Sequence, residues 1–385
     1  MPELTTKLPG VGTTIFTVMS ALAQEHNAIN LSQGFPDFPV PATLLDLMDK
    51  YLREGHNQYP PMTGVAYLRE QIARKIATLY GADLDADTEI TVTSGATEAL
   101  FVAIQAVVSS GDEVIVFDPA YDAYEPAVTL AGGITRHLSL TRPGFRYDWQ
   151  QVADAITPHT RLIIVNSPHN PCGSTISAED LDSLAELVRD RNIFILSDEV
   201  YEHMVFDRQR HLSLLGHKEL RERSFVVSSF GKTCHATGWK VAYCVAPPNL
   251  SREFRYIHQF VTFTTHTPTQ WALAEFLESC PEHYLELPQF YQAKRDLFLA
   301  EMTDSAFECV PSQGTYFQLA DYSRLSDMDD VAFARHLTTR VGVAAIPISV
   351  FCETAPDTRL VRFCFAKDDD TLRLAAARLR QMEPA

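Results

Sequence analysis

The chain has 385 residues, of which 46% are hydrophobic and 21% charged, so it is long enough to bury a large core and to form more than one domain. Its 32 Lys and Arg residues against 49 Asp and Glu residues give a net charge of −17. This charge repels phosphate backbones and anionic lipid surfaces, so we expect neither nucleic acid nor a membrane as a partner.

The first residues, MPELTTKLPGVGTT, contain neither the charged nor the apolar region of a secretory signal. No apolar run approaches the ~20 residues that cross a bilayer. The seven cysteines form no CxxC pair, which is typical of a reducing compartment. We therefore expect a cytoplasmic protein without a disulfide framework, and no bound metal.

Short runs rich in β-branched residues alternate with helical periodicity through the middle of the chain. Such an alternation predicts an α/β fold with a mainly parallel sheet and helices on both faces. Helices are expected at 97–109 and 177–189. Strands are predicted at 89–93, 113–117, 162–165, 193–196, 225–227 and 241–245.

The pattern changes near residue 250, where longer helical segments begin at 250–260, 269–277 and 285–301. They are followed by strand-rich sequence, FECVPSQGTYFQL and TRLVRFCFA. This change predicts a second, smaller α+β domain. We place an N-terminal segment at 1–40 that joins the small domain and the wall of the site, a large domain at 41–290 and the small domain at 291–385.

Ligands of open α/β sheets bind beyond the carboxyl ends of the strands, so the polar residues that follow each apolar run are the candidates. Ser94, Gly95, Ala96 and Thr97 lie between the first strand and a helix, where backbone N–H groups can bind an anion or simply be capped. Asn170 lies in a Pro-rich loop, and its amide either faces a ligand or bonds its own backbone.

Two charged residues follow the next strands. Asp198 comes at the end of a buried strand, where a carboxylate is costly unless it caps a backbone or meets a cation. Lys232 lies beyond the strand at 225–227. Partial burial at that position would lower the pKa of its amine and make it a nucleophile, whereas a lysine taken alone is normally a solvated surface residue.

Taken together, NSPHNPCG, SDEVY, SSFGKTCHATGWK and RFCFA resemble the class I/II aminotransferases, which have fold type I and use pyridoxal phosphate. The resemblance covers nearly the whole chain, from QGFPDFP to RFCFA. Within the family, GFPDFP, NQYPPMTG, FDPAYDAYEP, HTPTQ and RFCFAK are closest to the methionine and kynurenine (glutamine) aminotransferase branch. The resemblance implies a mainly parallel seven-stranded sheet in the large domain.

The resemblance makes Lys232 the Schiff-base lysine, which also moves the proton between the amino-acid Cα and the cofactor's C4′. It implies that Asp198 pairs with the pyridine nitrogen, because an adjacent carboxylate keeps that nitrogen protonated. Tyr201 and Asn170 would bond the phenolic oxygen, and Tyr121 would stack on the ring.

The same resemblance implies a homodimer with shared active sites, because one phosphate contact comes from the neighbouring subunit. Lys240 stands where many relatives have arginine, so it keeps the charge but loses the bidentate fork. Gly231 and Cys234 fit the pattern of small residues around the lysine. The phosphate contacts implied are Gly95, Ala96, Thr97, Ser229, Lys240 and the neighbour's Tyr59.

Arg362 would clamp the substrate α-carboxylate, with help from Asn170 and the Gly34 backbone. The side-chain wall would include Phe16 and, from the neighbouring subunit, Thr265 and His266. Phe16 can equally be a core residue.

No motif supplies the arginine with which relatives bind a distal carboxylate, so we expect a neutral or aromatic amino acid as donor: methionine, phenylalanine, tyrosine, kynurenine or glutamine. A 2-oxo acid would be the acceptor in a ping-pong reaction. One alternative is a β-eliminating lyase acting on cysteine conjugates or cystathionine. Another is a transcriptional regulator that combines an aminotransferase-like domain with a DNA-binding module. The negative net charge disfavours it, and so does the resemblance, which leaves no room for such a module.

Overall fold

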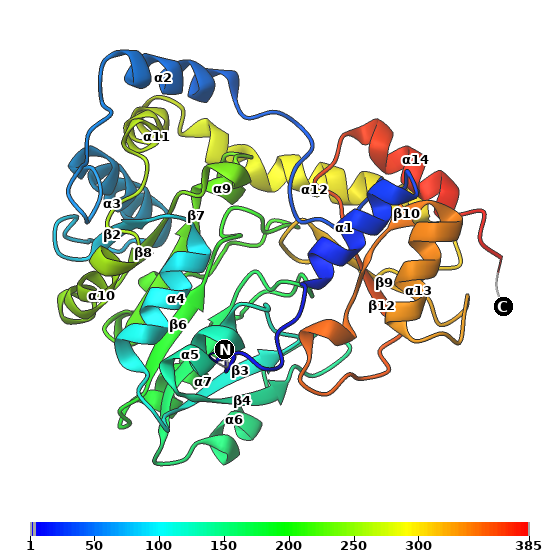
Figure 1. The fold of residues 1–385 in the computed structure, drawn as a ribbon, viewed down its shortest axis with the longest axis horizontal. Coiled ribbons are helices and arrows are strands. Elements are labelled where there is room, and N and C mark those ends of the chain that lie inside the picture. The colour runs from blue at the N-terminus through cyan, green and yellow to red at the C-terminus, as the bar shows by residue number, and fades with distance from the viewer. Residues whose placement is uncertain (1, 3–4, 384–385) are drawn as a thin grey trace.

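The computed structural model describes residue 2 and residues 5–383. A seven-stranded sheet forms the centre of the larger part of the molecule (Figure 1). The strands lie in the order β2-β8-β7-β6-β5-β3-β4. They are β2 (Ile90–Thr93), β3 (Glu113–Asp118), β4 (Ile134–Ser139), β5 (Thr160–Asn166), β6 (Phe194–Asp198), β7 (Ser224–Ser229) and β8 (Ala242–Val245).

The sheet is mainly parallel, as predicted, and β8 is the exception. It pairs antiparallel with β2 and with β7, whereas β4, β3, β5, β6 and β7 are parallel to one another. Because β8 reverses the direction twice, β2 runs the same way as β7. The carboxyl ends of the parallel strands and the beginning of β8 therefore meet at one edge of the sheet.

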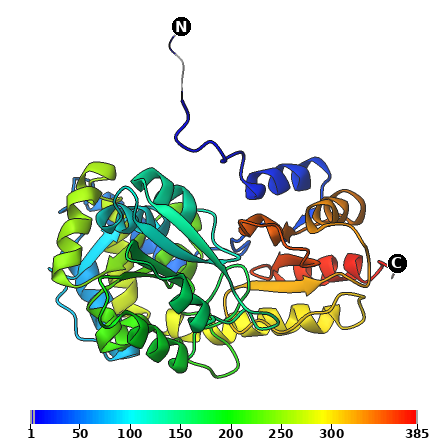
Figure 2. The same cartoon turned by 90° about the horizontal axis from the view of Figure 1, so that it is seen from below.

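The central strands are buried on both faces, because helices cover the sheet on either side (Figure 2). The edge strand β4 was not predicted. It carries Thr135, Arg136 and His137 in place of an apolar run, and its exposure alternates along the strand. The helices of this part are α2 (Ala42–Arg53), α3 (Ala66–Tyr80), α4 (Ala96–Val107), α5 (Tyr124–Ala131), α6 (Trp149–Ala155), α7 (Ala178–Val188), α8 (Lys218–Arg221), α9 (Phe230–Thr233), α10 (Pro248–Val261) and α11 (Thr267–Ser279).

The smaller part has an antiparallel sheet in the order β11-β12-β9 and a short parallel pair of β1 with β10. That pair brings the N-terminal segment beside the C-terminal third of the chain. The elements are α1 (Ile15–Glu25), β1 (Ile29–Asn30), β9 (Phe317–Asp321), α13 (Asp330–His336), β10 (Val343–Ala344), β11 (Ile346–Pro347), β12 (Leu360–Cys364) and α14 (Asp369–Leu379).

One long helix, α12 (Glu282–Met302), runs from the larger part into the smaller part (Figures 1 and 2). The predicted boundary at residue 290 falls inside this helix, so the division into domains stays a prediction. Across residues 5–383, no helix is both long and apolar enough to span a membrane.

Candidate active site

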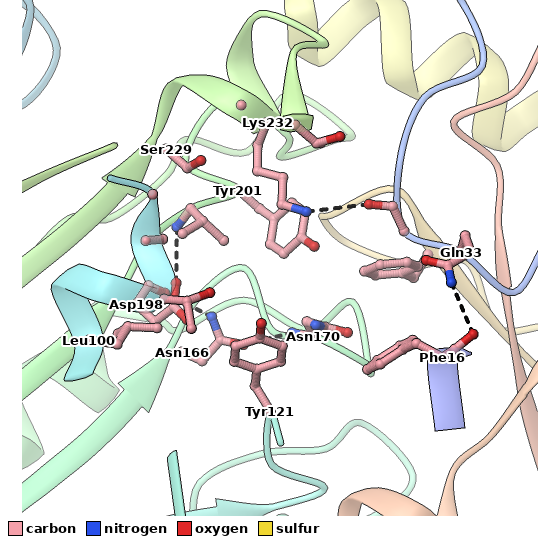
Figure 3. Close-up of a pocket in the computed structure, with 18 of the residues that line it drawn as sticks. Phe16, Gln33, Leu100, Tyr121, Asn166, Asn170, Asp198, Tyr201, Ser229 and Lys232 are labelled. Carbon is pink, nitrogen blue, oxygen red and sulfur yellow. Dashed lines mark hydrogen bonds between the residues drawn. The ribbon is translucent and has the colours of Figure 1, made fainter. Parts of the chain in front are cut away.

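A cavity of about 250 Å³ opens at the edge where the strands end (Figure 3). Its walls come from both parts of the molecule. The predicted residues that line it are Phe16, Gly34, Gly95, Ala96, Thr97, Tyr121, Asn170, Asp198, Tyr201, Ser229, Lys232, Lys240 and Arg362. The chain thus brings together side chains that are far apart in the sequence.

Lys232 lies on α9, which begins directly after β7. Its Nζ donates to the Tyr316 hydroxyl at 2.9 Å and to the Gly34 carbonyl at 3.3 Å. Burial lowers the pKa of the amine to about 8. Gly231 allows this tight turn, because a Cβ there would come within 3.1 Å of the Thr237 Cα. At neutral pH a larger fraction of the half-buried Lys232 amine is therefore in the neutral, nucleophilic form than of a surface lysine.

Asp198 is the last residue of β6, two residues beyond the predicted end of that strand. Burial raises the pKa of its carboxyl to about 6, although Tyr124 opposes the rise by donating its hydroxyl to Oδ2 at 2.8 Å. The Val200 N–H donates to Oδ1 at 3.3 Å. No cation of the described residues forms an ion pair with this carboxylate. A buried carboxylate without a cation suits a ligand that carries a positive charge.

Arg362 lies on β12 and is fully buried. Its Nη1 donates to Asn170 Oδ1 at 2.7 Å, and its Nη2 donates to the Ser32 carbonyl at 3.0 Å. The guanidinium stacks 3.8 Å from the centre of the Phe317 ring. Its Nε has no hydrogen-bond partner among the described residues. The Asn170 amide oxygen is thus committed to Arg362, which leaves its NH₂ group to donate into the cavity.

The turn before α4 is built to receive an anion. Gly95 is the N-cap with φ of 90°, and no side chain caps this helix end. A Cβ on Gly95 would lie 3.0 Å from the Lys240 Nζ. A lysine ammonium beside a helix N-terminus places two positive potentials together, which is unfavourable unless an anion lies between them. Ser229 lies at the same edge, at the end of β7.

These features fit pyridoxal phosphate. The turn and Lys240 suit the phosphate, the unpaired Asp198 suits a protonated ring nitrogen, and Lys232 suits the aldehyde. Arg362 suits the carboxylate of an amino acid. The fold and the site together define an enzyme that acts on amino acids, in which the Lys232 amine and the buried Asp198 carboxylate line one cavity.

A family model described as aminotransferase class I and II matches residues 26–379. The chain therefore belongs to the class I and II aminotransferases, which confirms the predicted family. It is 54% identical to methionine aminotransferase of Escherichia coli, over 98% of this chain and 97% of that one. A solved Escherichia coli structure, YbdL, identified as having a methionine aminotransferase function, gives a TM-score of 0.98 at 54% identity, covering 99% of this chain and 100% of that one.

Two further relatives are similar over almost their whole length. The probable N-succinyldiaminopimelate aminotransferase of Mycobacterium tuberculosis is 40% identical, over 97% of each chain. The kynurenine–oxoglutarate transaminase of Dictyostelium discoideum is 36% identical, over 97% of this chain and 94% of that one. The predicted fold type is confirmed by these likenesses.

Three predicted residues lie outside the cavity. Tyr59 is 83% exposed, and its ring packs edge-on against Phe263 at 5.4 Å. Thr265 is buried, and His266 is exposed at the start of α11, where its Nδ1 lies 2.7 Å from the Thr269 hydroxyl. All three were expected to serve the neighbouring subunit's site, so their roles stay predictions.

Sequence reasoning missed several residues that shape the site. Asn166 ends β5 next to Asp198 and could have been found by the rule that located Asp198. Its Nδ2 donates to the Asp198 carbonyl at 2.8 Å. Tyr124, Tyr316 and Phe317 carried no local signal, because each meets its partner only through the packing of distant segments. Phe16 does line the cavity, with its ring centre 5.4 Å from the Arg362 guanidinium.

Proposed function

We propose that this aminotransferase uses pyridoxal phosphate to move the amino group of a neutral or aromatic L-amino acid, methionine above all, to a 2-oxo acid. The observation that carries this proposal is the inventory of cations in the cavity. Among the described residues that line it, Lys232, Lys240 and Arg362 are the only Lys and Arg residues. The three are needed for the amine chemistry, the phosphate and the α-carboxylate. None of this subunit's lining cations is left for a distal carboxylate.

When bound, pyridoxal phosphate supplies an aldehyde that takes up the amino group and a ring that accepts electrons from the substrate's Cα. Lys232 would take the proton from Cα and return it at C4′, a role suited to an amine with a pKa of about 8. Asp198 would hold the proton on the ring nitrogen. Tyr201 and Asn170 would donate to the phenolic oxygen, and Arg362 would orient the carboxylate with its guanidinium fork.

The wall around the carboxylate site is aromatic. Phe317 lies against the Arg362 guanidinium, and the rings of Phe16 and Phe351 lie within 5.8 Å of each other. An apolar thioether or an aromatic side chain gains contact with such rings, whereas a carboxylate loses its hydration there. The name of the 54% identical relative supports methionine, and that of the relative from Dictyostelium supports an aromatic donor.

A single-turnover panel tests the donor. The holoenzyme is mixed with methionine, phenylalanine, kynurenine, glutamine or aspartate, and the spectrum of the bound cofactor is followed. We expect methionine and the aromatic donors to react fastest and aspartate at least 100-fold more slowly, since a buried unpaired charge costs ~3 kcal/mol or more. Equal rates for aspartate and methionine would contradict the proposal. Pyruvate released from a β-substituted cysteine would instead indicate the lyase.

Lys232→Ala is the variant that must lose the reaction, and Lys294→Ala is its matched control. Lys294 is also a largely buried lysine, but it pairs with Asp369 at 2.8 Å, away from the cavity. We expect Lys294→Ala to keep the spectral change and Lys232→Ala to abolish it while remaining folded.

We also infer a homodimer with shared sites. Tyr59, Phe260, Val261 and Phe263 are exposed, with Tyr59 and Phe260 more than 80% exposed. The segments that carry them are joined, because the Thr267 hydroxyl donates to the Gln58 carbonyl at 2.7 Å. Such a group of exposed apolar side chains favours a protein interface. A cytoplasmic location remains part of the proposal, supported by seven free cysteines.

Mixed dimers test the sharing. Lys232→Ala and Tyr59→Ala subunits are unfolded together and refolded as a mixture. If Tyr59 serves the neighbour's site, half of the dimers are mixed and each has one intact site, so about a quarter of the wild-type sites return. Lys232→Ala mixed with Arg362→Ala returns intact sites only if these two residues come from different subunits. Recovery in this second mixture, or none in the first, would overturn the assignment.

A further inference from the structure

His258 and Glu98 form a buried pair behind the turn that begins α4. His258 belongs to α10, which packs against α4 (Figure 1), and it is 0% exposed. Its Nδ1 lies 2.6 Å from Glu98 Oε1, and its Nε2 lies 2.9 Å from the Met62 carbonyl oxygen. The other Glu98 oxygen accepts the Ser94 N–H at 2.5 Å. Neither member lines the cavity.

The hydrogen bonds fix the charges of the pair. A carbonyl oxygen can only accept, so His258 Nε2 carries a proton and donates it to Met62. His258 Nδ1 and Glu98 Oε1 lie 2.6 Å apart, so one further proton lies between them, because two bare acceptors would repel each other at that distance. The pair as a whole therefore carries no net charge.

This charge balance matters at an anion site. A lone Glu98 carboxylate would repel a phosphate bound at the same turn, and the proton that His258 shares with it removes that repulsion. His258 also fixes the position of Met62 through its carbonyl oxygen. The carbonyl oxygen of the next residue, Thr63, accepts the Val92 N–H at 3.0 Å. The segment that carries Tyr59 is thereby held beside the turn.

We propose that Glu98 and His258 are a positioning pair for the cofactor phosphate, in which Glu98 holds the turn at Ser94 and His258 cancels the charge of Glu98. The inference rests on the proposed function, because it assumes that the phosphate binds at this turn. It predicts a particular pattern among variants. Loss of His258 alone should harm phosphate binding, and further loss of the Glu98 carboxyl group should repair it.

The apoprotein is titrated calorimetrically with inorganic phosphate, pyridoxal phosphate and pyridoxal. For H258N we expect about tenfold weaker binding of both phosphate-bearing probes, the loss due to one uncompensated charge, and little change for pyridoxal. E98Q keeps an oxygen for Ser94 and should bind phosphate as tightly as the wild type or more tightly. The double variant E98Q/H258N should recover to within about threefold of the wild type.

His211→Asn is the matched control. His211 Nε2 lies 2.8 Å from Glu199 Oε2, and both side chains are at least 95% buried, but they do not line the cavity. We expect this variant to lower the thermal midpoint without changing phosphate affinity. A loss of stability alone would then be separated from a loss of phosphate binding. If H258N fails to fold, H258Q takes its place in the same cycle.

Three results would overturn the pair's role: wild-type phosphate affinity in folded H258N, a double variant no better than H258N, or equal losses for pyridoxal and pyridoxal phosphate. A wild-type apoprotein that binds pyridoxal no more weakly than pyridoxal phosphate would also overturn it. The proposed function fails in a different way. A holoenzyme that binds the phosphate normally but transfers no amino group would refute amino transfer and leave the pair intact.

Discussion

Replacing Asp198 by asparagine removes a buried charge and keeps the shape of the side chain. Burial raises the pKa of this carboxyl from 3.8 to about 6. The folded apoprotein therefore holds the proton more tightly than the unfolded chain, so ionisation opposes folding. The penalty is absent below pH 3.8, grows between 3.8 and about 6, and is fully present above that range. A difference of about 2.2 in pKa corresponds to ~3 kcal/mol.

We therefore expect the Asp198→Asn apoprotein to be more stable than the wild type by up to about 3 kcal/mol at pH 7.5. The asparagine oxygen can still accept the Tyr124 hydroxyl. The advantage should shrink by about 1.4 kcal/mol for each pH unit below 6. If the cofactor binds as proposed, the sign should reverse, because the carboxylate would then face the protonated ring nitrogen. The same substitution should weaken cofactor binding and slow proton removal from Cα by several orders of magnitude.

Urea unfolding of the two apoproteins at pH 5, 6 and 7.5 measures the difference in free energy of unfolding. Asp330→Asn is the control, since Asp330 is also buried but accepts two bonds from Ser349, at 2.7 and 2.6 Å. That variant should lose stability at every pH. An Asp198→Asn apoprotein less stable than the wild type at pH 7.5, or a difference independent of pH, would refute the reasoning.

Three further outcomes follow from the site. The pKa of the Lys232 amine is lowered to about 8, and only the neutral amine attacks an aldehyde. The rate at which the apoprotein associates with pyridoxal phosphate should therefore rise about tenfold per pH unit below pH 8 and level off above it. A rise that continues to pH 10 would contradict this assignment. Arg362→Lys should lose the bidentate fork and raise KM for amino and oxo acids alike, by about tenfold or more in steady-state assays. Gly95→Ala, at a φ of 90°, should cost about 1–2 kcal/mol in urea unfolding and weaken cofactor binding by displacing Lys240.

The five predicted helices could be located from the sequence to within three residues at each end. The helix predicted at 285–301 is α12, Glu282–Met302, and the one predicted at 177–189 is α7, Ala178–Val188. The six predicted strands of the large sheet end within two residues of the observed ones, and β6 continues past its predicted end because Asp198 keeps buried partners there. The strand β4 was missed because it lies at the edge of the sheet and is partly exposed. It therefore carries polar residues and lacks the apolar run by which the other strands were found.

The residues of the candidate site fall into two groups, those near the end of a strand and those that reach the site only through packing. Asp198 and Lys232 could be named as candidates because each lies within five residues after a predicted strand, and the position of a strand end is a local property of the chain. Tyr316 could not be predicted, since it meets Lys232 only after the small sheet packs against the large one. A local pattern identifies the residues at the edge of a sheet and leaves open which segment covers that edge.

The position of Lys240 shows how topology completes the proposed phosphate site. Lys240 precedes β8, so a strand-end rule for parallel sheets would put it at the edge far from the site. Because β8 is antiparallel to both neighbours, Ala242 lies opposite Thr93 on one side and Ser229 on the other. This register brings Lys240, two residues before β8, beside the α4 turn. A parallel β8 of the same four residues would carry Lys240 about 13 Å away, to the opposite edge, and would leave the helix N-terminus without its cation.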